Sequence, residues 1–241
     1  MNADPSTLLA ISGVFLLAGA VKGVIGLGLP TVAMGLLGLF LPPAEAAALL
    51  VLPSLLTNLW QAAAGGPILP LLRQLAPLLL GILGGTALGL WLGLGLGGDT
   101  ALARRGLGLA LVLYGLFGLA ERRLTLPARA MRAAGAASGL MTGVVTAGTG
   151  VFVLPTVPYL QALGLERRAL LQAMGLAFSI STLALAASLP GTPALGASAA
   201  ALLPTLLGMA LGQKLNLPPV LFRRLFFTGL LLLGAHLALG A

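Results

Sequence analysis

The sequence lacks the residues on which several protein classes depend. It contains no cysteine, which excludes disulfide bonds, thiolate metal sites and cysteine nucleophiles. Only 7% of its 241 residues are charged, whereas a soluble domain carries about 25%. This leaves too little polar surface to cover a water-soluble globule of this size.

Acidic residues are also few, and they stand outside the apolar runs. The five are Asp4, Glu45, Asp99, Glu121 and Glu166, and each lies in or beside a predicted connection. The carboxylates of a membrane-embedded cation or proton site are therefore missing. An embedded enzyme would need a nucleophile, metal ligands or a carboxylate pair in the membrane. We expect no enzyme, no metal site and no cofactor.

Most of the residues that the sequence does contain are apolar. Hydrophobic residues make up 59% of the chain, and the mean hydropathy is +1.08. Because a helical span needs about 20 apolar residues, we predict an all-α, polytopic helical membrane protein with one transmembrane domain over residues 1–241. The first apolar stretch is expected to be a retained span rather than a signal peptide. Ten apolar segments can be marked, at Ser6–Val21, Leu27–Leu41, Ala44–Ala64, Leu75–Leu96, Ala101–Leu119, Ala133–Thr146, Gly150–Leu163, Ala169–Leu189, Leu195–Leu211 and Val220–Leu239.

The basic residues orient these segments. The net charge of +8 does not indicate nucleic-acid binding, because the cations stand at segment ends. In a ten-segment model, all but Arg104 and Arg105 of the 13 fall on one face. The positive-inside rule makes that face cytoplasmic and puts both termini outside. The residues on it are Lys22, Arg73, Arg122, Arg123, Arg129, Arg132, Arg167, Arg168, Lys214, Arg223 and Arg224.

The two halves of the chain repeat one another. Gly19-x-x-x-Gly23 recurs as Gly139-x-x-x-Gly143, and Pro77-x-x-x-Gly81-x-x-x-Gly85 recurs as Pro204-x-x-x-Gly208-x-x-x-Gly212. Five segments in each half (repeat 1 about 6–120, repeat 2 about 133–240) predict two inverted repeats, as in secondary transporters. The first two segments of each half are expected to be short or re-entrant. For the glycines of the proline motif, simple helix packing is the favoured interpretation.

Two glycine clusters mark the expected site. Gly23–Pro30 and Thr146–Pro155 weaken helix propensity, and irregular backbone at membrane depth persists where it lines a cavity or is buried in protein. A helix that starts after such a break directs free N–H groups into that space. Two such ends would form an anion site near the midplane. Ordinary tight turns are the alternative.

The polar residues near these clusters each have two possible roles. Lys22 either snorkels to the cytoplasmic surface or faces the cavity. Ser54, Thr57, Asn58 and Gln61 form a stripe that either lines a path or bonds neighbouring helices, and so do Gln172, Ser179, Ser181 and Thr182. The candidate substrate-binding residues are Lys22, Gly26, Gly28, Asn58, Gln61, Thr146, Gly148, Thr149, Gly150 and Ser179.

Several of these stretches resemble a known family. Gly-Val-Ile-Gly-Leu-Gly-Leu-Pro from Gly23, Leu-Pro-Pro-Ala-Glu-Ala-Ala-Ala from Leu41 and the Pro-Ser…Thr-Asn-Leu-Trp-Gln stretch from Pro53 are similar to the TauE/SafE sulfite exporter family. The resemblance covers nearly the whole chain. It implies multi-pass bacterial inner-membrane transport of sulfite, sulfoacetate or a related organosulfonate or carboxylate. We therefore expect a secondary transporter of a small anion, as an exporter working by alternating access. Its partners would be that anion and the lipid bilayer, with no nucleic acid. An auxiliary membrane subunit or an enzyme without transport activity is the alternative.

Overall fold

The protein is all-helical over the residues that the structure describes. The computed structural model describes residues 4–120, 125–191, 195–215 and 218–240, so Arg122 and Arg123 lie outside the described residues. These ranges hold ten α-helices and one short 3-10 helix, Ala128–Ala130. The ten are α1 (Pro5–Ile25), α2 (Leu29–Leu37), α3 (Pro43–Ala63), α4 (Ile68–Trp91), α5 (Thr100–Leu119), α6 (Met131–Thr149), α7 (Thr156–Ala162), α8 (Arg167–Ser188), α9 (Leu195–Lys214) and α10 (Pro219–Leu239).

Each predicted apolar segment coincides with one of these helices. In the described ranges seven of them are long and apolar enough to cross a membrane, namely α1, α3, α4, α5, α8, α9 and α10. The prediction of a polytopic helical membrane protein is confirmed. The largest shift of a boundary is in α4, which begins at Ile68 rather than Leu75 and so includes Arg73 within the helix.

The first segment of each half was expected to be short or re-entrant, and of these two alternatives the structure contradicts the short one. Helix α1 has 21 residues and continues through Gly19 and Gly23, and α6 has 19 residues and continues through Gly139 and Gly143. A glycine lowers helix propensity by about 1 kcal/mol, but an unpaired backbone group in lipid costs several kcal/mol. The helix therefore persists through these glycines.

Only the second segment of each half is short, as predicted. Helix α2 has 9 residues and α7 has 7, so at about 1.5 Å per residue neither alone crosses a hydrocarbon core about 30 Å thick. Non-helical backbone precedes each helix, over Gly26–Gly28 before α2 and Gly150–Pro155 before α7. These two breaks are the irregular backbone that the glycine clusters predicted.

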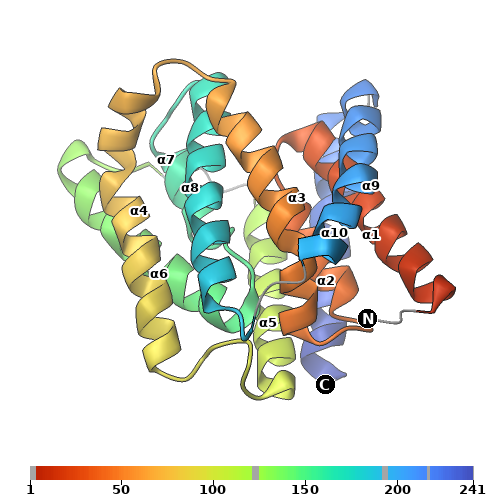
Figure 1. The fold of residues 1–241 in the computed structure, drawn as a ribbon. Coiled ribbons are helices and arrows are strands. Elements are labelled where there is room, and N and C mark those ends of the chain that lie inside the picture. The colour runs from red at the N-terminus through yellow and green to blue at the C-terminus, as the bar shows by residue number, and fades with distance from the viewer. Residues whose placement is uncertain (1–3, 121–124, 192–194, 216–217, 241) are drawn as a thin grey trace.

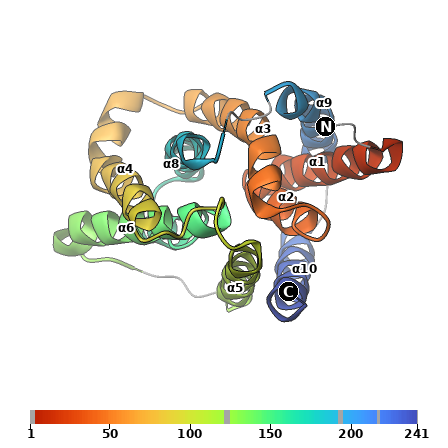
Figure 2. The same ribbon diagram turned by 60° about the horizontal axis from the view of Figure 1, so that its bottom comes forward.

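The helices associate in four close pairs (Figures 1 and 2). Helix α1 packs against α9, α4 against α6, α3 against α8, and α5 against α10. Figure 2 shows α4 and α6 on one side, α1, α9 and α10 on the other, and α3 and α8 between them. The α3–α8 pair is thus the centre of the bundle.

The repeated glycine motifs form the same kind of helix crossing twice, each time between a helix of one half and a helix of the other. A Cβ at Gly19 would overlap the carbonyl oxygen of Thr205, and one at Gly208 would overlap that of Leu16. In the α4–α6 pair, Gly139 lies in the same way against Leu78, and Gly81 against Ala136. Such contact between backbones is what small-xxx-small spacing allows in lipid. The packing interpretation of the glycines of the proline motif, Gly81, Gly85, Gly208 and Gly212, is confirmed.

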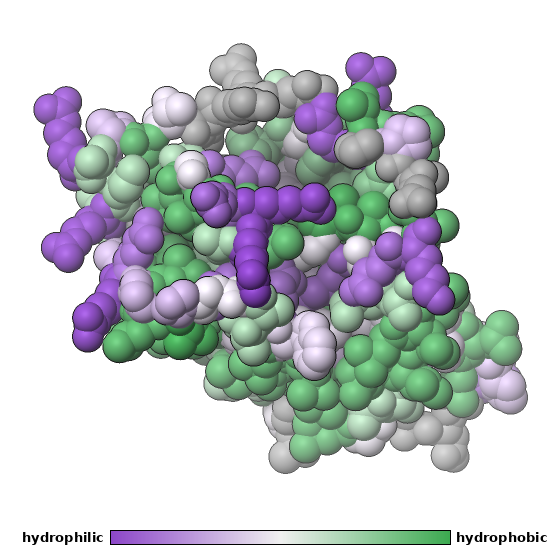
Figure 3. Space-filling model, turned by 90° about the horizontal axis from the view of Figure 1, so that it is seen from above, coloured by the Kyte–Doolittle hydropathy of each residue, from purple (hydrophilic) through white to green (hydrophobic). Residues whose placement is uncertain are grey.

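Both termini lie at the same end of the bundle, the lower end in Figure 1. The α3–α4 and α7–α8 connections and the end of α9 lie at the upper end. Hydrophilic residues gather over that upper face in Figure 3. Exposed cations beside these connections include Arg73, Arg167, Arg168 and Lys214.

Candidate functional site

Lys22 lies in the last turn of α1 and points into the bundle rather than out to the surface. Only 4% of the residue is exposed, so it does not snorkel. Its Nζ donates a hydrogen bond to Thr57 Oγ1 at 3.0 Å and another to Asn58 Oδ1. The two acceptors are consecutive residues of α3.

The partners of this buried ammonium group are neutral. The described acidic residues all lie at helix starts and are exposed: Asp4, Asp99 and Glu166 occupy N-cap positions, and Glu45 is in the first turn of α3. None of them contacts Lys22 in the described residues. A buried charge is costly unless it is paired. The site therefore has an excess positive charge that an anion can compensate.

A cavity of about 250 Å³ lies beside Lys22. It is bounded by the carboxyl ends of α1, α3 and α9 and by the amino end of α8, so it lies toward the upper, basic end in Figures 1 and 3. Arg167 and Arg168 line it, and Arg168 Nε donates to the carbonyl oxygen of Ala64 at 3.3 Å. The other lining residues are Lys22, Gly23, Val24, Ile25, Gly26, Thr57, Trp60, Gln61, Ala64, Leu171, Met209 and Gln213. Among the described residues, three cations and no acidic residue line this cavity.

The polar stripe of α3 serves both of the roles that the sequence left open. Asn58 Nδ2 donates to Ser54 Oγ at 3.1 Å, and Ser54 Oγ pairs with Thr182 Oγ1 of α8 at 3.1 Å. These bonds join α1, α3 and α8 through Lys22. Thr57 and Gln61, in contrast, line the cavity, and Gln61 Nε2 donates to the carbonyl oxygen of Leu171 at 2.9 Å.

The polar residues of α8 mostly hold the helices together. Ser179 Oγ donates to the carbonyl oxygen of Gly175, 2.7 Å away in its own helix, and it does not line the Lys22 cavity. Gln172 forms three hydrogen bonds to the end of α3 and the α3–α4 connection. Its Nε2 donates to the carbonyl oxygens of Ala62 and Gly66, and its Oε1 accepts from the Gly66 N–H. The Gln172 bonds hold the α3–α4 connection against α8.

The first glycine cluster contributes directly to this region. Gly26 lines the cavity and caps α1 with a positive φ of 75°. Gly28 caps the start of α2 with a φ of 102°, a conformation that residues with a Cβ rarely adopt. A Cβ at Gly28 would also approach Val21 Cγ1 to 2.9 Å. The break therefore requires glycine at this position.

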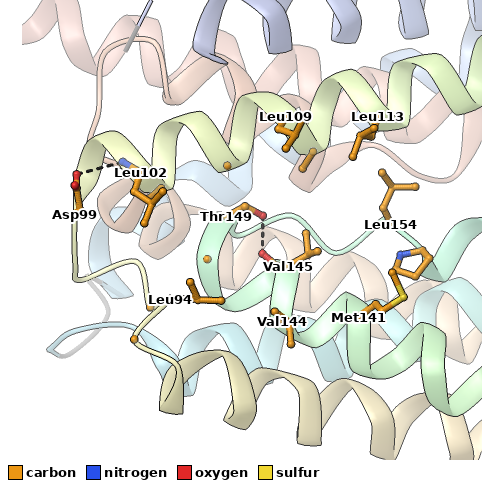
Figure 4. Close-up of a pocket in the computed structure, with 17 residues that line it drawn as sticks. Leu94, Asp99, Leu102, Leu109, Leu113, Met141, Val144, Val145, Thr149 and Leu154 are labelled. Atoms are coloured by element: carbon orange, nitrogen blue, oxygen red, sulfur yellow. Dashed lines mark hydrogen bonds between the residues drawn. The ribbon is translucent and has the colours of Figure 1, made fainter. Parts of the chain in front are cut away.

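The second glycine cluster lies elsewhere. Thr146 is buried and donates to the carbonyl oxygen of Thr142 at 2.7 Å, and Gly150 ends α6 with a φ of 71°, close to the Met34 side chain of α2. Gly148 and Thr149 line a different cavity of about 550 Å³ between α5 and α6 (Figure 4).

This second cavity is mainly apolar. Figure 4 shows the side chains of Leu94, Leu102, Leu109, Leu113 and Leu154 around it. Its one charged lining residue is Asp99, which caps α5 by accepting from the N–H groups of Ala101 and Leu102. The structure thus brings Lys22, Gly26, Asn58 and Gln61 together but leaves Gly28, Thr146, Gly148, Thr149, Gly150 and Ser179 outside the lining of the Lys22 cavity.

Thr57, Arg167 and Arg168 line the cavity but are not among the substrate-binding candidates that the sequence predicts. In the sequence, Thr57 is one member of a polar stripe with two open roles, and Arg167 and Arg168 indicate only the topology. A signal for the arginines was present, since the pair directly precedes the segment that carries Gln172 and Ser179. No sequence pattern indicated that the start of this segment would lie beside the same cavity as Lys22.

Comparison with known proteins gives one match. A family model described as "Sulfite exporter TauE/SafE" matches residues 11–237. Neither the curated proteins nor the solved structures contain a match.

Proposed function

The chain belongs to the TauE/SafE sulfite exporter family, and we propose that it exports sulfite or a related small organosulfonate or carboxylate through the Lys22 cavity. The family consists of anion exporters of the membrane, so an exporter-type transporter is the general function. The proposal adds the substrate class, the site and the direction. In this proposal the protein resides in a bacterial inner membrane, with both termini in the periplasm.

The observation that carries this proposal is the buried ammonium group of Lys22. Its two hydrogen-bond acceptors, Thr57 and Asn58, are neutral, and the adjacent cavity adds Arg167 and Arg168. An anion that enters from the basic face meets positive charge at the mouth and again at the base. Charge-assisted hydrogen bonds from an ammonium group to an oxyanion are about twice as strong as neutral ones.

Alternating access would follow from inverted repeats. The repeated crossings of α1 with α9 and of α6 with α4 support two equivalent helix pairs on either side of the central α3–α8 pair. Five segments per half would insert the halves in opposite directions. Movement of the outer pairs against the centre would then close the cavity on the basic face and open it on the other.

The membrane potential is a sufficient driving force for such export. A potential of 100 mV acts on an elementary charge with about 2.3 kcal/mol. Because the cytoplasm is negative, this term drives an anion outward and increases with each charge that it carries. The proposed mechanism therefore requires no nucleotide hydrolysis.

Flux measurements on purified protein in liposomes test the proposal. We expect flux of sulfite, sulfoacetate or a simple carboxylate, and little flux of the zwitterion taurine. Lys22→Gln should remove the charge and abolish anion flux, whereas Lys214→Gln is the matched control, because Lys214 is exposed at the end of α9. Unchanged flux in the Lys22→Gln variant, or no flux of any anion by the wild type, would refute the proposed function.

A further inference from the structure

The amino end of α2 holds a cluster of hydrogen-bond donors, most of them buried, that have no acceptor among the described residues. The Gly26 N–H is used, since it donates to the Lys22 carbonyl oxygen at 2.7 Å, and the Val32 N–H donates to the Gly28 carbonyl oxygen at 2.9 Å. Between them, the N–H groups of Leu27, Gly28, Leu29 and Thr31 donate to no described residue. Residue 30 is proline and has no N–H.

The side chain of Thr31 adds a fifth donor. Thr31 is 0% exposed, and its Oγ1 has no hydrogen-bond partner. It is the third residue of α2, and helical Cα–Cβ bonds tilt toward the amino end. Its hydroxyl therefore lies over the same first turn as the free N–H groups. Most of this region is also closed to solvent, because Gly28, Leu29 and Pro30 are buried.

Unpaired buried donors are rare in proteins, and where they occur a bound ion or water is a common reason. Here the donors gather at the positive end of a helix dipole, and no described acidic side chain contacts them. A cation is excluded by this sign. An anion can accept from several N–H groups and a hydroxyl at once, as at other helix amino ends.

We propose that the amino end of α2 is a second anion-binding position, which receives the transported anion after the Lys22 cavity. This inference rests on the proposed function. The two positions are neighbours along the chain, since only Gly23–Gly28 separates Lys22 from α2. They are also neighbours in space, because Gly28 lies against Val21, the residue before Lys22. The break in the backbone thus connects the Lys22 position, which borders the cavity, with the amino end of α2 inside the bundle.

Thr31 is the residue through which this position can be tested, because its hydroxyl is the only side-chain donor in the cluster. Thr31→Val keeps the shape and removes the hydroxyl, whereas Thr31→Ser keeps the hydroxyl. The matched control is Thr86→Val. Thr86 is also buried, but its Oγ1 donates to the Ile82 carbonyl oxygen within α4, and α4 does not pack against α2.

The experiment measures sulfite flux into liposomes and sulfite affinity in detergent for each variant. Loss of a hydrogen bond to a charged group should lower the flux of Thr31→Val about tenfold or more. Its affinity for sulfite should stay within about twofold of the wild type, because first binding occurs at Lys22. Thr31→Ser should restore the flux, and Thr86→Val should transport like the wild type.

Three results would overturn the inference while leaving the proposed function intact. Wild-type flux in a monodisperse Thr31→Val protein would mean that the donors bind only buried water. Equal loss in Thr31→Val and Thr31→Ser would show a packing role for this residue. Wild-type flux that disappears when chloride is replaced by gluconate would assign the position to a resident chloride ion rather than to the substrate. Failure of the wild type to transport any anion would instead refute the proposed function itself.

Discussion

Lys22 on α1 donates a hydrogen bond to the side-chain oxygen of Asn58 on α3. This orientation leaves the amide nitrogen of Asn58 facing Ser54, to which it donates at 3.1 Å. Asn58 therefore positions the ammonium group of Lys22, and its own amide N–H is engaged by Ser54. Its oxygen and the anion compete for the same three N–H donors of Lys22.

The first prediction concerns the charge at position 58. Asn58→Asp places a carboxylate beside the Lys22 ammonium group and neutralises it. Unit charges about 4 Å apart interact by about 4 kcal/mol at an effective dielectric of about 20, so we expect sulfite affinity to fall at least tenfold. The melting temperature should stay the same or rise, because the new ion pair replaces a hydrogen bond.

Asn58→Ala provides the comparison for that variant. It leaves Ser54 and Lys22 each without one partner, which should lower the stability by about 1–3 kcal/mol. Affinity should change less than in Asn58→Asp. Sulfite affinity is measured by calorimetry and stability by thermal unfolding for both variants. If Asn58→Asp binds sulfite as tightly as the wild type, position 58 is not part of the site.

The second prediction uses two adjacent glycines of α4. Gly85 faces the backbone of Leu140 on α6, whereas a Cβ at Gly84 would meet nothing within 4 Å. Gly85→Leu should separate the α4–α6 pair and lower the yield of monodisperse protein, because overpacking costs about 1–3 kcal/mol or more. Gly84→Leu should be tolerated. Size-exclusion profiles and melting temperatures measure both effects, and equal behaviour of the two variants would contradict the observed crossing.

The third prediction concerns the two arginines at the cavity. Arg167 and Arg168 are exposed lining residues and should raise the local concentration of anions through their field. The double substitution to Gln should reduce the initial rate of flux at low ionic strength. The difference from the wild type should shrink near 0.15 M salt, where the Debye length is about 8 Å.

Arg73→Gln is the matched control for the arginine pair. Arg73 is exposed and stands near the start of α4, after the α3–α4 connection at the same end of the bundle, but it does not line the cavity. It should leave the initial rate unchanged at every ionic strength. A double variant whose rate deficit does not depend on salt would show that the arginines act by local contacts rather than by long-range attraction.

The fourth prediction is the orientation of the chain in the membrane. The described cations other than Arg104 and Arg105 lie in or near one set of connections, which the positive-inside rule assigns to the cytoplasm. Both termini lie at the opposite end of the bundle. An alkaline phosphatase fused after Ala241 should be active, and a green fluorescent protein at the same place should be dark. The reverse pattern would also remove the inverted arrangement of the halves.

The sequence by itself determined the features that depend on local pattern. Apolar runs of span length predicted ten helices, because a backbone in lipid must satisfy its hydrogen bonds within each segment. The repeated glycine spacing predicted close helix crossings, because only small residues allow two backbones to touch. Glycine clusters predicted the breaks before α2 and α7. Lys22 was a candidate because it stands beside the first of these clusters.

The tertiary structure alone decided which of these residues act together. The direction of Lys22 was open in the sequence, since a lysine near a helix end can reach the surface or turn inward, and its partners Thr57 and Asn58 lie on another helix. Ser54 meets Thr182, 128 positions along the chain, and no local pattern contains such a contact. The second glycine cluster shows the same limit. Its sequence matches the first, but the packing of α5 and α6 surrounds it with leucines and leaves it outside the cavity of Lys22.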